Sequence, residues 1–369
     1  MSKKIRILMV LGNTGRGGAQ AYVMNVLRNI DHDKFQIDFA VCESKPDGYD
    51  DEMRRYGSKI LYIHPFRFLN YLEYSKKWKE ILSGNKYDIV EAHATNAAAF
   101  FLRIAKKEGI KTIAHSHSAG YRGNAIEKNI KKIVSKATKK ESDYWFACSD
   151  LAAERLFGKK YHNYPRYYNI PNAIDSKIFR FRDEIRNEIR NELGIKDEIV
   201  IGHVGTFSEP KNHFFLLRVF HKLLSINSNY RLLLLGDGLL KEKVKHKVDE
   251  LGLTNYVRFT GNVPNVNEYM MAMDIMVFPS LFEGFPVTLI EAQATGLPCI
   301  ISDVITKEVD QTDLIHRLSL KDSEDEWVNT IVKTKNSSRE IYNSIISETK
   351  YDVGTSMSVL MNIYKEMIK

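Results

Sequence analysis

The stretch that most constrains the fold of this chain is residues 278–303, FPSLFEGFPVTLIEAQATGLPCIISD. An apolar run comes first, and a helical pattern begins near Pro286, because proline lacks the N–H group that the first turn of a helix leaves unpaired. Gly296 and Pro298 end that helix, and a second apolar run follows at 299–302. The order strand, loop, helix, strand predicts one crossover unit of a parallel sheet.

The loop and the start of this helix carry residues suited to a ligand. A helix N-terminus offers unpaired N–H groups and a partial positive charge, so we expect Val287 and Thr288 to face a phosphate. Glu283 stands before the helix, where it can reach a group above the helix start. Glu291 stands further along, where its carboxylate can accept hydrogen bonds from a ribose. The arrangement fits a diphosphate flanked by two polyols.

The motif Glu283-x7-Glu291, within EGFPVTLIEAQATGLP, resembles the signature of retaining glycosyltransferases of family four, which have the GT-B fold. The resemblance implies that Glu283 contacts the donor sugar and Glu291 the nucleotide ribose. It also implies donor contacts along the loop at Gly284, Phe285 and Pro286. A helix with one capping and one solvated glutamate is the other interpretation of the pattern.

Bulk properties bound the class of protein. With 369 residues, 44% of them hydrophobic, the chain is long enough for two domains with separate cores. Its three cysteines lie far apart and suggest neither a disulfide framework nor a metal site, which fits a reducing cytoplasm. No apolar run reaches the roughly 18 residues of a membrane span. The net charge of +8 permits nucleic acid, anionic lipid or an anionic substrate as a partner.

A glycine-rich loop follows the first predicted strand, residues 5–11. Gly12, Gly15, Gly17 and Gly18 precede a helical pattern, which suits close approach by a polar ligand. Their spacing is not G-x-G-x-x-G, so no dinucleotide is implied, and the loop alone favours a plain strand–helix turn. The resemblance implies that Gly17 and Gly18 lie close to donor and acceptor.

The first half of the chain alternates apolar runs with amphipathic helical stretches, which predicts one doubly wound α/β domain. After the first strand, these runs are 35–42, 58–63, 87–93, 112–117 and 144–148.

Polar side chains gather at the ends of two of these runs. Glu91 and His93 end one run, and His115 and His117 end the next, at the sheet edge where ligands of such domains bind. A lone histidine is more often structural, but three histidines with a glutamate favour a site. The resemblance implies that His117 faces the donor sugar and that His115 supports it.

Residues 126–141, IEKNIKKIVSKATKKE, form the most basic segment, and we expect an amphipathic helix there. The apolar residues expected on its buried face are Ile126, Ile130, Ile133, Val134 and Ala137. Its lysines are Lys128, Lys131, Lys132, Lys136, Lys139 and Lys140. A solvated surface helix and electrostatic docking on an anionic membrane surface are both open interpretations. The lipid-linked acceptors that the resemblance implies favour the second.

The runs that predict a second Rossmann-like sheet are 199–205, 231–235, 256–260, 274–279 and 298–302. Lys211, in the loop after the first of them, is placed to pair with a diphosphate. The resemblance implies donor contacts at Gly205 and at the next position, where relatives usually have arginine and this chain has Thr206. That departure bears on donor affinity. The resemblance also implies contacts to the base at Val263 and Asn265.

These patterns predict an α/β protein of the GT-B class, with two Rossmann-like domains facing a cleft. The expected acceptor-binding domain is 1–178 and the nucleotide-sugar domain 179–350, while a helix at 351–369 packs back on the first domain.

The predicted function is retaining transfer of a hexose or hexosamine from a nucleoside diphosphate sugar, with UDP as the favoured nucleotide. The expected acceptor is a saccharide or a lipid-linked saccharide of cell-surface polysaccharide synthesis. The expected catalytic residues are His117, Glu283 and Lys211, and we expect no metal or other cofactor, since Lys211 and the helix N–H groups supply positive charge.

We expect a cytoplasmic protein, peripheral at the inner face of the plasma membrane, with no nucleic-acid partner. Two other functions stay open. One is a weak or inactive GT-B protein that assists another transferase, and the other is a sugar-nucleotide epimerase or phosphorylase of the same architecture.

Overall fold

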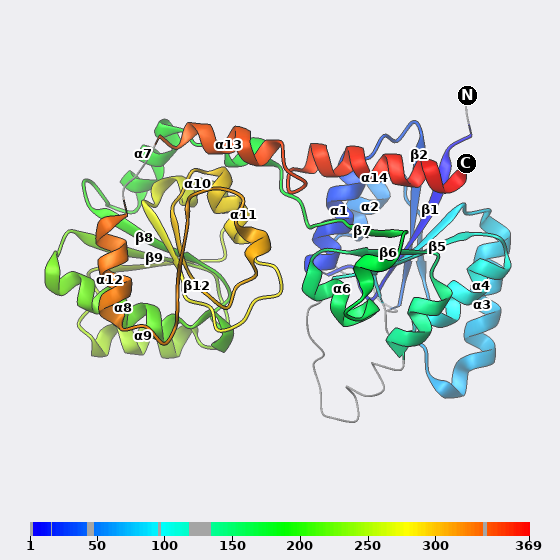
Figure 1. Ribbon diagram of the computed structural model, residues 1–369, viewed down its shortest axis with the longest axis horizontal. Coiled ribbons are helices and arrows are strands. Elements are labelled where there is room, and N and C mark those ends of the chain that lie inside the picture. The colour runs from blue at the N-terminus through cyan, green and yellow to red at the C-terminus, as the bar shows by residue number, and fades with distance from the viewer. Residues whose placement is uncertain (1–2, 16, 43–47, 95–96, 118–133, 335–337) are drawn as a thin grey trace. The chain divides into compact units, whose positions relative to one another are not determined.

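A computed structural model describes residues 3–15, 17–42, 48–94, 97–117, 134–334 and 338–369. The chain forms two compact units. The first unit is Met1–Ala173 with Val353–Lys369, and the second is Ile174–Asp352. Each unit contains one parallel sheet with helices on its faces (Figure 1).

The first unit is built on a seven-stranded parallel sheet in the order β3-β2-β1-β4-β5-β6-β7. Its strands are β1 (Ile5–Leu11), β2 (Phe35–Val41), β3 (Ile60–Tyr62), β4 (Ile89–Ala92), β5 (Lys111–Ser116), β6 (Tyr144–Ala147) and β7 (Tyr167–Asn169). Its helices are α1 (Gly18–Asn29), α2 (Asp50–Arg55), α3 (Tyr71–Asn85), α4 (Ala98–Lys107), α6 (Asp150–Phe157) and α14 (Val353–Ile368), and residues 134–141 are also helical.

Alternation along β1 sends side chains to two hydrophobic cores, one on each face of the sheet. Ile7 and Met9 enter the core beneath α1 and α14, whereas Leu8 and Val10 enter the core beneath α3, α4 and α6. Because both faces are covered, most residues of the central strands are apolar, which is why these strands were recognisable in the sequence.

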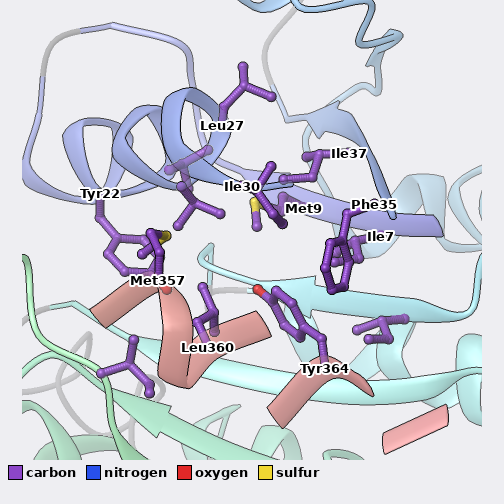
Figure 2. Close-up of a cluster of buried hydrophobic side chains, with 14 of the residues drawn as sticks. Ile7, Met9, Tyr22, Leu27, Ile30, Phe35, Ile37, Met357, Leu360 and Tyr364 are labelled. Carbon is purple, nitrogen blue, oxygen red and sulfur yellow. The ribbon is translucent and has the colours of Figure 1, made fainter. Parts of the chain in front are cut away.

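The C-terminal helix α14 belongs to the first unit. Its buried side chains include Met357, Leu360 and Tyr364, whose spacing places them on one face of a helix. Figure 2 shows these three side chains directed toward the core that holds Ile7 and Phe35. The chain therefore completes its first core with its last helix.

The second unit is built on a six-stranded parallel sheet in the order β10-β9-β8-β11-β12-β13. Its strands are β8 (Ile199–Val204), β9 (Tyr230–Leu235), β10 (Val257–Gly261), β11 (Ile275–Phe278), β12 (Cys299–Ser302) and β13 (Ile315–Leu318). Its helices are α7 (Asp183–Glu192), α8 (His213–Ile226), α9 (Lys241–Glu250), α10 (Val266–Ala272), α11 (Val287–Ala294), α12 (Glu324–Lys333) and α13 (Glu340–Ser347). Helices α10, α11 and α13 contribute to one core, and α8, α9 and α12 to the other.

Gly296 ends α11 as the sequence predicted. Its φ is +67°, a left-handed conformation that favours glycine, and a Cβ there would lie 2.4 Å from the Arg339 carbonyl oxygen. The buried Arg339 guanidinium donates to several carbonyl groups, among them Thr295 O at 3.0 Å. Any larger residue at 296 would disturb that packing.

One prediction about the basic segment is wrong. Ala137, assigned to the buried face, is exposed, while Ser135 and Thr138 are buried. Position on the helix decides which side chains are buried, because Ser135 and Thr138 lie three residues apart and so share one face. Ile126, Ile130 and Ile133 lie outside the described residues. Within the described part of the chain, no helix has both the length and the apolar character needed to cross a bilayer.

Candidate functional site

The strand order of the second sheet reverses between β8 and β11, the kind of point at which open parallel sheets bind ligands. The loops 205–212 and 279–286 both leave the sheet at this edge. The Asn212 side-chain amide donates to the Pro279 carbonyl oxygen at 3.0 Å and so ties the two loops together.

Lys211 and Glu283 meet at this edge. Lys211 Nζ lies 2.7 Å from Glu283 Oε1, and the side chains are only 17% and 13% exposed. Ser280 Oγ donates to the same carboxylate oxygen at 2.7 Å, and the lysine ammonium lies 4.4 Å from the centroid of the Phe278 ring. An incoming phosphate therefore has to compete with Glu283 for the lysine.

Gly205 lies beneath the Lys211 side chain. A Cβ at this position would come within 3.0 Å of Lys211 Cε and 3.4 Å of His203 Nε2, so a larger residue would displace the lysine. His203 is buried, and its Nδ1 lies 2.9 Å from Val277 O. Burial, His213 and Lys211 hold the pKa of His203 well below its usual range, so the ring stays neutral.

Helix α11 begins directly after Pro286, and Val287 and Thr288 form the start of its first turn. Within the described residues, no side chain caps this end, which leaves its first N–H groups able to bind an anion. Glu291 lies further along the same helix. Burial raises the pKa of its carboxyl to about 7.

A hollow of about 190 Å³ lies next to Gly205, at the ends of β8, β9 and β10. Thr206, Asn262 and Val263 are among the residues that line it. The structure thus brings Gly205, Thr206 and Val263 together, and adds Asn262, which the sequence analysis missed. Asn262 directly follows a strand, so the rule that ligands gather at strand ends could have found it.

Two predicted donor contacts use their side chains elsewhere. The Asn265 amide pairs with the Glu268 carboxylate at the start of α10, and Asn265 does not line the hollow. The Phe285 ring stacks on Tyr351 at 5.1 Å with a 10° interplanar angle. Gly284, beside Phe285, belongs to the loop that carries Glu283.

In the first unit, the glycine-rich loop leads into α1. Gly17 is the residue before the helix, and a Cβ on it would meet Gln20 Oε1 at 2.6 Å. Gln20 in turn donates to Asn13 Oδ1 at 2.7 Å and so fixes the loop. Gly18 is the first helical residue, and a Cβ there would lie 3.8 Å from Asn172 Nδ2. A larger residue at position 17 would have to displace the flexible end of the Gln20 side chain, whereas position 18 has ordinary van der Waals space.

The three histidines meet at the ends of β4 and β5. His93 Nδ1 and His117 Nε2 are 2.8 Å apart, and His115 Nδ1 lies 2.8 Å from Glu91 Oε1. The His115 and His117 rings stack at 4.1 Å, and the Tyr22 ring of α1 packs edge-on against His115 at 4.7 Å. The sequence analysis placed the histidines at this edge but missed Tyr22.

Burial keeps these rings neutral. It lowers the pKa of His115 to about 3 and holds the pKa values of His93 and His117 well below their usual range. In this state each ring has one N–H donor and one lone pair, which suits hydrogen bonding to a hydroxyl group rather than binding an anion. The ring nitrogens also lie close enough to be considered as metal ligands, since all three lie within 4.8 Å of one another.

Of the six predicted membrane lysines, three lie in the described helical stretch 134–141. Lys136 and Lys140 are exposed, but Lys139 donates to Phe157 O at 2.8 Å and its ammonium lies 4.7 Å from the Trp145 ring centroid. Lys128, Lys131 and Lys132 are outside the described residues.

Comparison with known proteins identifies the family. Residues 16–177 match the family described as Glycosyltransferase Family 4, and residues 185–326 match Glycosyl transferases group 1. The chain is also 32% identical to the putative glycosyltransferase EpsF of Bacillus subtilis (strain 168), over 98% of this chain and 97% of that protein. This chain belongs to glycosyltransferase family 4.

Two further comparisons concern a relative and the fold. The glycosyltransferase is 24% identical to an Escherichia coli enzyme named UDP-Gal:alpha-D-GlcNAc-diphosphoundecaprenol alpha-1,3-galactosyltransferase, over 82% of this chain and 80% of that protein. Its structure matches that of Anabaena HepE in complex with UDP, with a TM-score of 0.81 at 16% identity, covering 98% of this chain and 100% of HepE. The match confirms the predicted GT-B fold of two parallel-sheet, Rossmann-like domains.

Proposed function

We propose that this glycosyltransferase moves a hexose or hexosamine from a UDP-sugar, with retention of anomeric configuration, to a saccharide or lipid-linked acceptor of cell-surface polysaccharide synthesis. The observation that carries the proposal is one sheet edge where Lys211, the N-terminus of α11 and the hollow beside Thr206 meet. A nucleoside diphosphate needs this combination of positive charge and a slot for its base.

The choice of UDP and of a lipid-linked acceptor has support from the relatives. HepE is known in complex with UDP. The Escherichia coli enzyme is named for a UDP-sugar donor and an acceptor on diphosphoundecaprenol.

The geometry suggests how the residues act. The diphosphate takes the N–H groups of Val287 and Thr288 and draws Lys211 away from Glu283. Lys211 and these N–H groups then stabilise the charge on the leaving diphosphate, without need of a metal. Glu283, freed from the lysine, orients the sugar. His117 accepts a hydrogen bond from a sugar hydroxyl.

A thermal-shift panel tests the donor. UDP and UDP-sugars should raise the melting temperature while ADP and GDP do not, because only a ligand of the folded state stabilises it. The same shift with a chelator present would support metal-free binding. In NMR spectra of the transfer product, the anomeric proton of the transferred sugar should show the same α configuration as in the UDP-sugar. A β-anomeric signal would reject retention.

Thr206 favours a second candidate, a catalytically weak partner of another transferase. Threonine brings no charge to the place where relatives usually have arginine, and it is exposed on the rim of the hollow. UDP binding without any transfer or epimerisation product would favour this candidate.

A further inference from the structure

The buried carboxylate of Glu91 joins the C-terminal helix to the three histidines. Tyr364 of α14 donates its hydroxyl hydrogen bond to Glu91 Oε2, and His115 Nδ1 lies 2.8 Å from Glu91 Oε1. Both Glu91 and Tyr364 are fully buried. The two residues are 273 positions apart in the sequence, so the contact exists only because α14 packs on the first sheet.

The hydrogen bonds fix where each imidazole carries its proton. With Glu91 ionised, its carboxylate only accepts, and His115 then carries its proton on Nδ1. His93 Nε2 lies 3.5 Å from the same Glu91 oxygen, and the negative charge favours the tautomer with N–H on that side. His93 Nδ1 then holds a lone pair.

The last step concerns His117. Its Nε2 lies 2.8 Å from His93 Nδ1, so His117 Nε2–H donates and its Nδ1 is left with a lone pair. Among the described residues, no group meets the distance and angle of a hydrogen bond at that nitrogen, although the Asn172 amide lies near enough to the ring to raise its pKa. We propose that Glu91 and Tyr364 are positioning residues that hold His117 in the Nε2–H tautomer, so that its Nδ1 accepts a hydrogen bond from a sugar hydroxyl. The identity of the hydroxyl donor rests on the proposed function.

Tyr364 has a distinct part in this arrangement. Burial raises the pKa of Glu91, whereas the hydrogen bond from Tyr364 lowers it and favours the ionised acceptor form. A protonated Glu91 would donate a hydrogen bond instead, and the preference for the His115 Nδ1–H and His117 Nε2–H tautomers would be lost. The buried Tyr22 ring packs against all three imidazole rings, with centroid distances of 4.7–5.7 Å.

The direct test is two-bond ¹H–¹⁵N NMR of the full chain labelled with ¹⁵N-histidine, with His117→Gln used to assign the signal. The wild type should show His117 with its proton on Nε2. Glu91→Gln should give a mixture of tautomers or the reverse one, and Tyr364→Phe should move the same signals to a smaller extent. A wild-type His117 protonated on Nδ1, or tautomers unchanged in both variants, would overturn the proposal.

A matched control is Tyr87→Phe, because Tyr87 is a buried tyrosine of the same unit whose hydroxyl donates to Asp38 at 3.0 Å, away from the histidines. It should lose comparable stability and leave the His117 signal unchanged. Tyr364→Phe keeps the ring in the core, so it serves if Glu91→Gln fails to fold.

Two further readouts separate the competing explanations. Elemental analysis should find no stoichiometric transition metal. One bound zinc ion per chain would overturn the proposal, because zinc would bind the histidine lone pairs that the proposal assigns to hydrogen bonds. Tyr364→Phe should lower kcat for transfer from the active UDP-sugar about tenfold, as for one lost hydrogen bond, with UDP affinity unchanged. If wild type fails to bind UDP, the proposed function fails while the tautomer result stands.

Discussion

At the scale of single residues, the proposed contact between Glu291 and the ribose predicts that donor binding depends on pH. Burial raises the pKa of Glu291 to about 7, and in the proposed site ribose hydroxyls donate to its ionised form, so donor binding has to remove its proton. The affinity for UDP-glucose, measured by calorimetry, should therefore fall about tenfold from pH 8 to pH 6. His203 and His213 stay neutral over this interval because burial lowers their pKa values, that of His213 to about 4.

Glu291→Gln supplies the control for this effect. Glutamine can still accept from a hydroxyl but does not titrate, so its affinity should be lower than wild type at pH 8 and insensitive to pH. A wild-type affinity that is flat over the same range would remove Glu291 from the ribose site.

Thr206 is the residue at which an added charge should help. The side chain is exposed at the hollow, so arginine has room to reach a diphosphate. Thr206→Arg should tighten UDP binding by about 1–2 kcal/mol, the range of one charge-assisted hydrogen bond. Thr206→Gln, long but uncharged, should give no such gain in competition assays between UDP and donor. Weaker binding by the arginine variant would mean that another group already occupies that place.

At the scale of elements, the two loops joined by Lys211 and Glu283 act as one unit. Glu283→Gln removes the carboxylate that holds the lysine, so UDP should bind as well as in wild type or better while most transfer is lost. Glu324→Gln is a matched control, because it breaks an ion pair with Arg218 of similar length, 2.6 Å, at a more exposed place in the same unit. Intact transfer by Glu283→Gln would reduce Glu283 to a structural partner of Lys211.

The helical stretch 134–141 carries the remaining prediction at this scale. Lys136→Glu with Lys140→Glu should release the protein from anionic vesicles in flotation assays, because both lysines are exposed, and added salt should act in the same direction. Lys76→Glu with Lys79→Glu reverses the same charge on α3, where both lysines are also exposed, and should have little effect. Vesicle binding that changes with neither the charge reversal nor added salt would contradict membrane docking by this stretch.

Some strands and helix faces could be predicted from the sequence, and others could not. Strands such as β1 and β11 were predictable because burial on both faces makes them continuous apolar runs. The edge strands β7 (YYN) and β13 (IHRL) were missed, since three or four residues with polar members resemble a loop. Ala137 was misplaced because a small residue suits either face of a helix, and packing decides between them.

The candidate site shows the same division. Local motifs predicted that Lys211, Glu283 and the start of α11 share one edge, because they lie in or just after the loops that follow two adjacent strands, β8 and β11. The ion pair between the first two was not predictable, since its formation depends on side-chain rotamers. The contact of Tyr364 with Glu91 has no local signal at all, because only the path of the C-terminal helix brings the two together.

At the scale of the whole molecule, the two units have separate cores, and this predicts two unfolding transitions in calorimetry. Leu360 is fully buried in a core of the first unit, and Leu232 in a core of the second. Leu360→Ala should lower one transition, by about 2–5 kcal/mol in unfolding free energy, and Leu232→Ala should lower the other by a similar amount.

UDP then identifies which transition belongs to the donor site. Lys211, Glu283 and Glu291 all lie in the second unit, so UDP should raise the transition that Leu232→Ala lowers and leave the one that Leu360→Ala lowers unchanged. At a UDP concentration 100 times the dissociation constant, the stabilisation should be about 2.7 kcal/mol. If UDP instead raised only the transition sensitive to Leu360→Ala, the donor site would have to be sought around the histidines of the first unit. A single transition that moves with both substitutions would show that the two cores unfold as one.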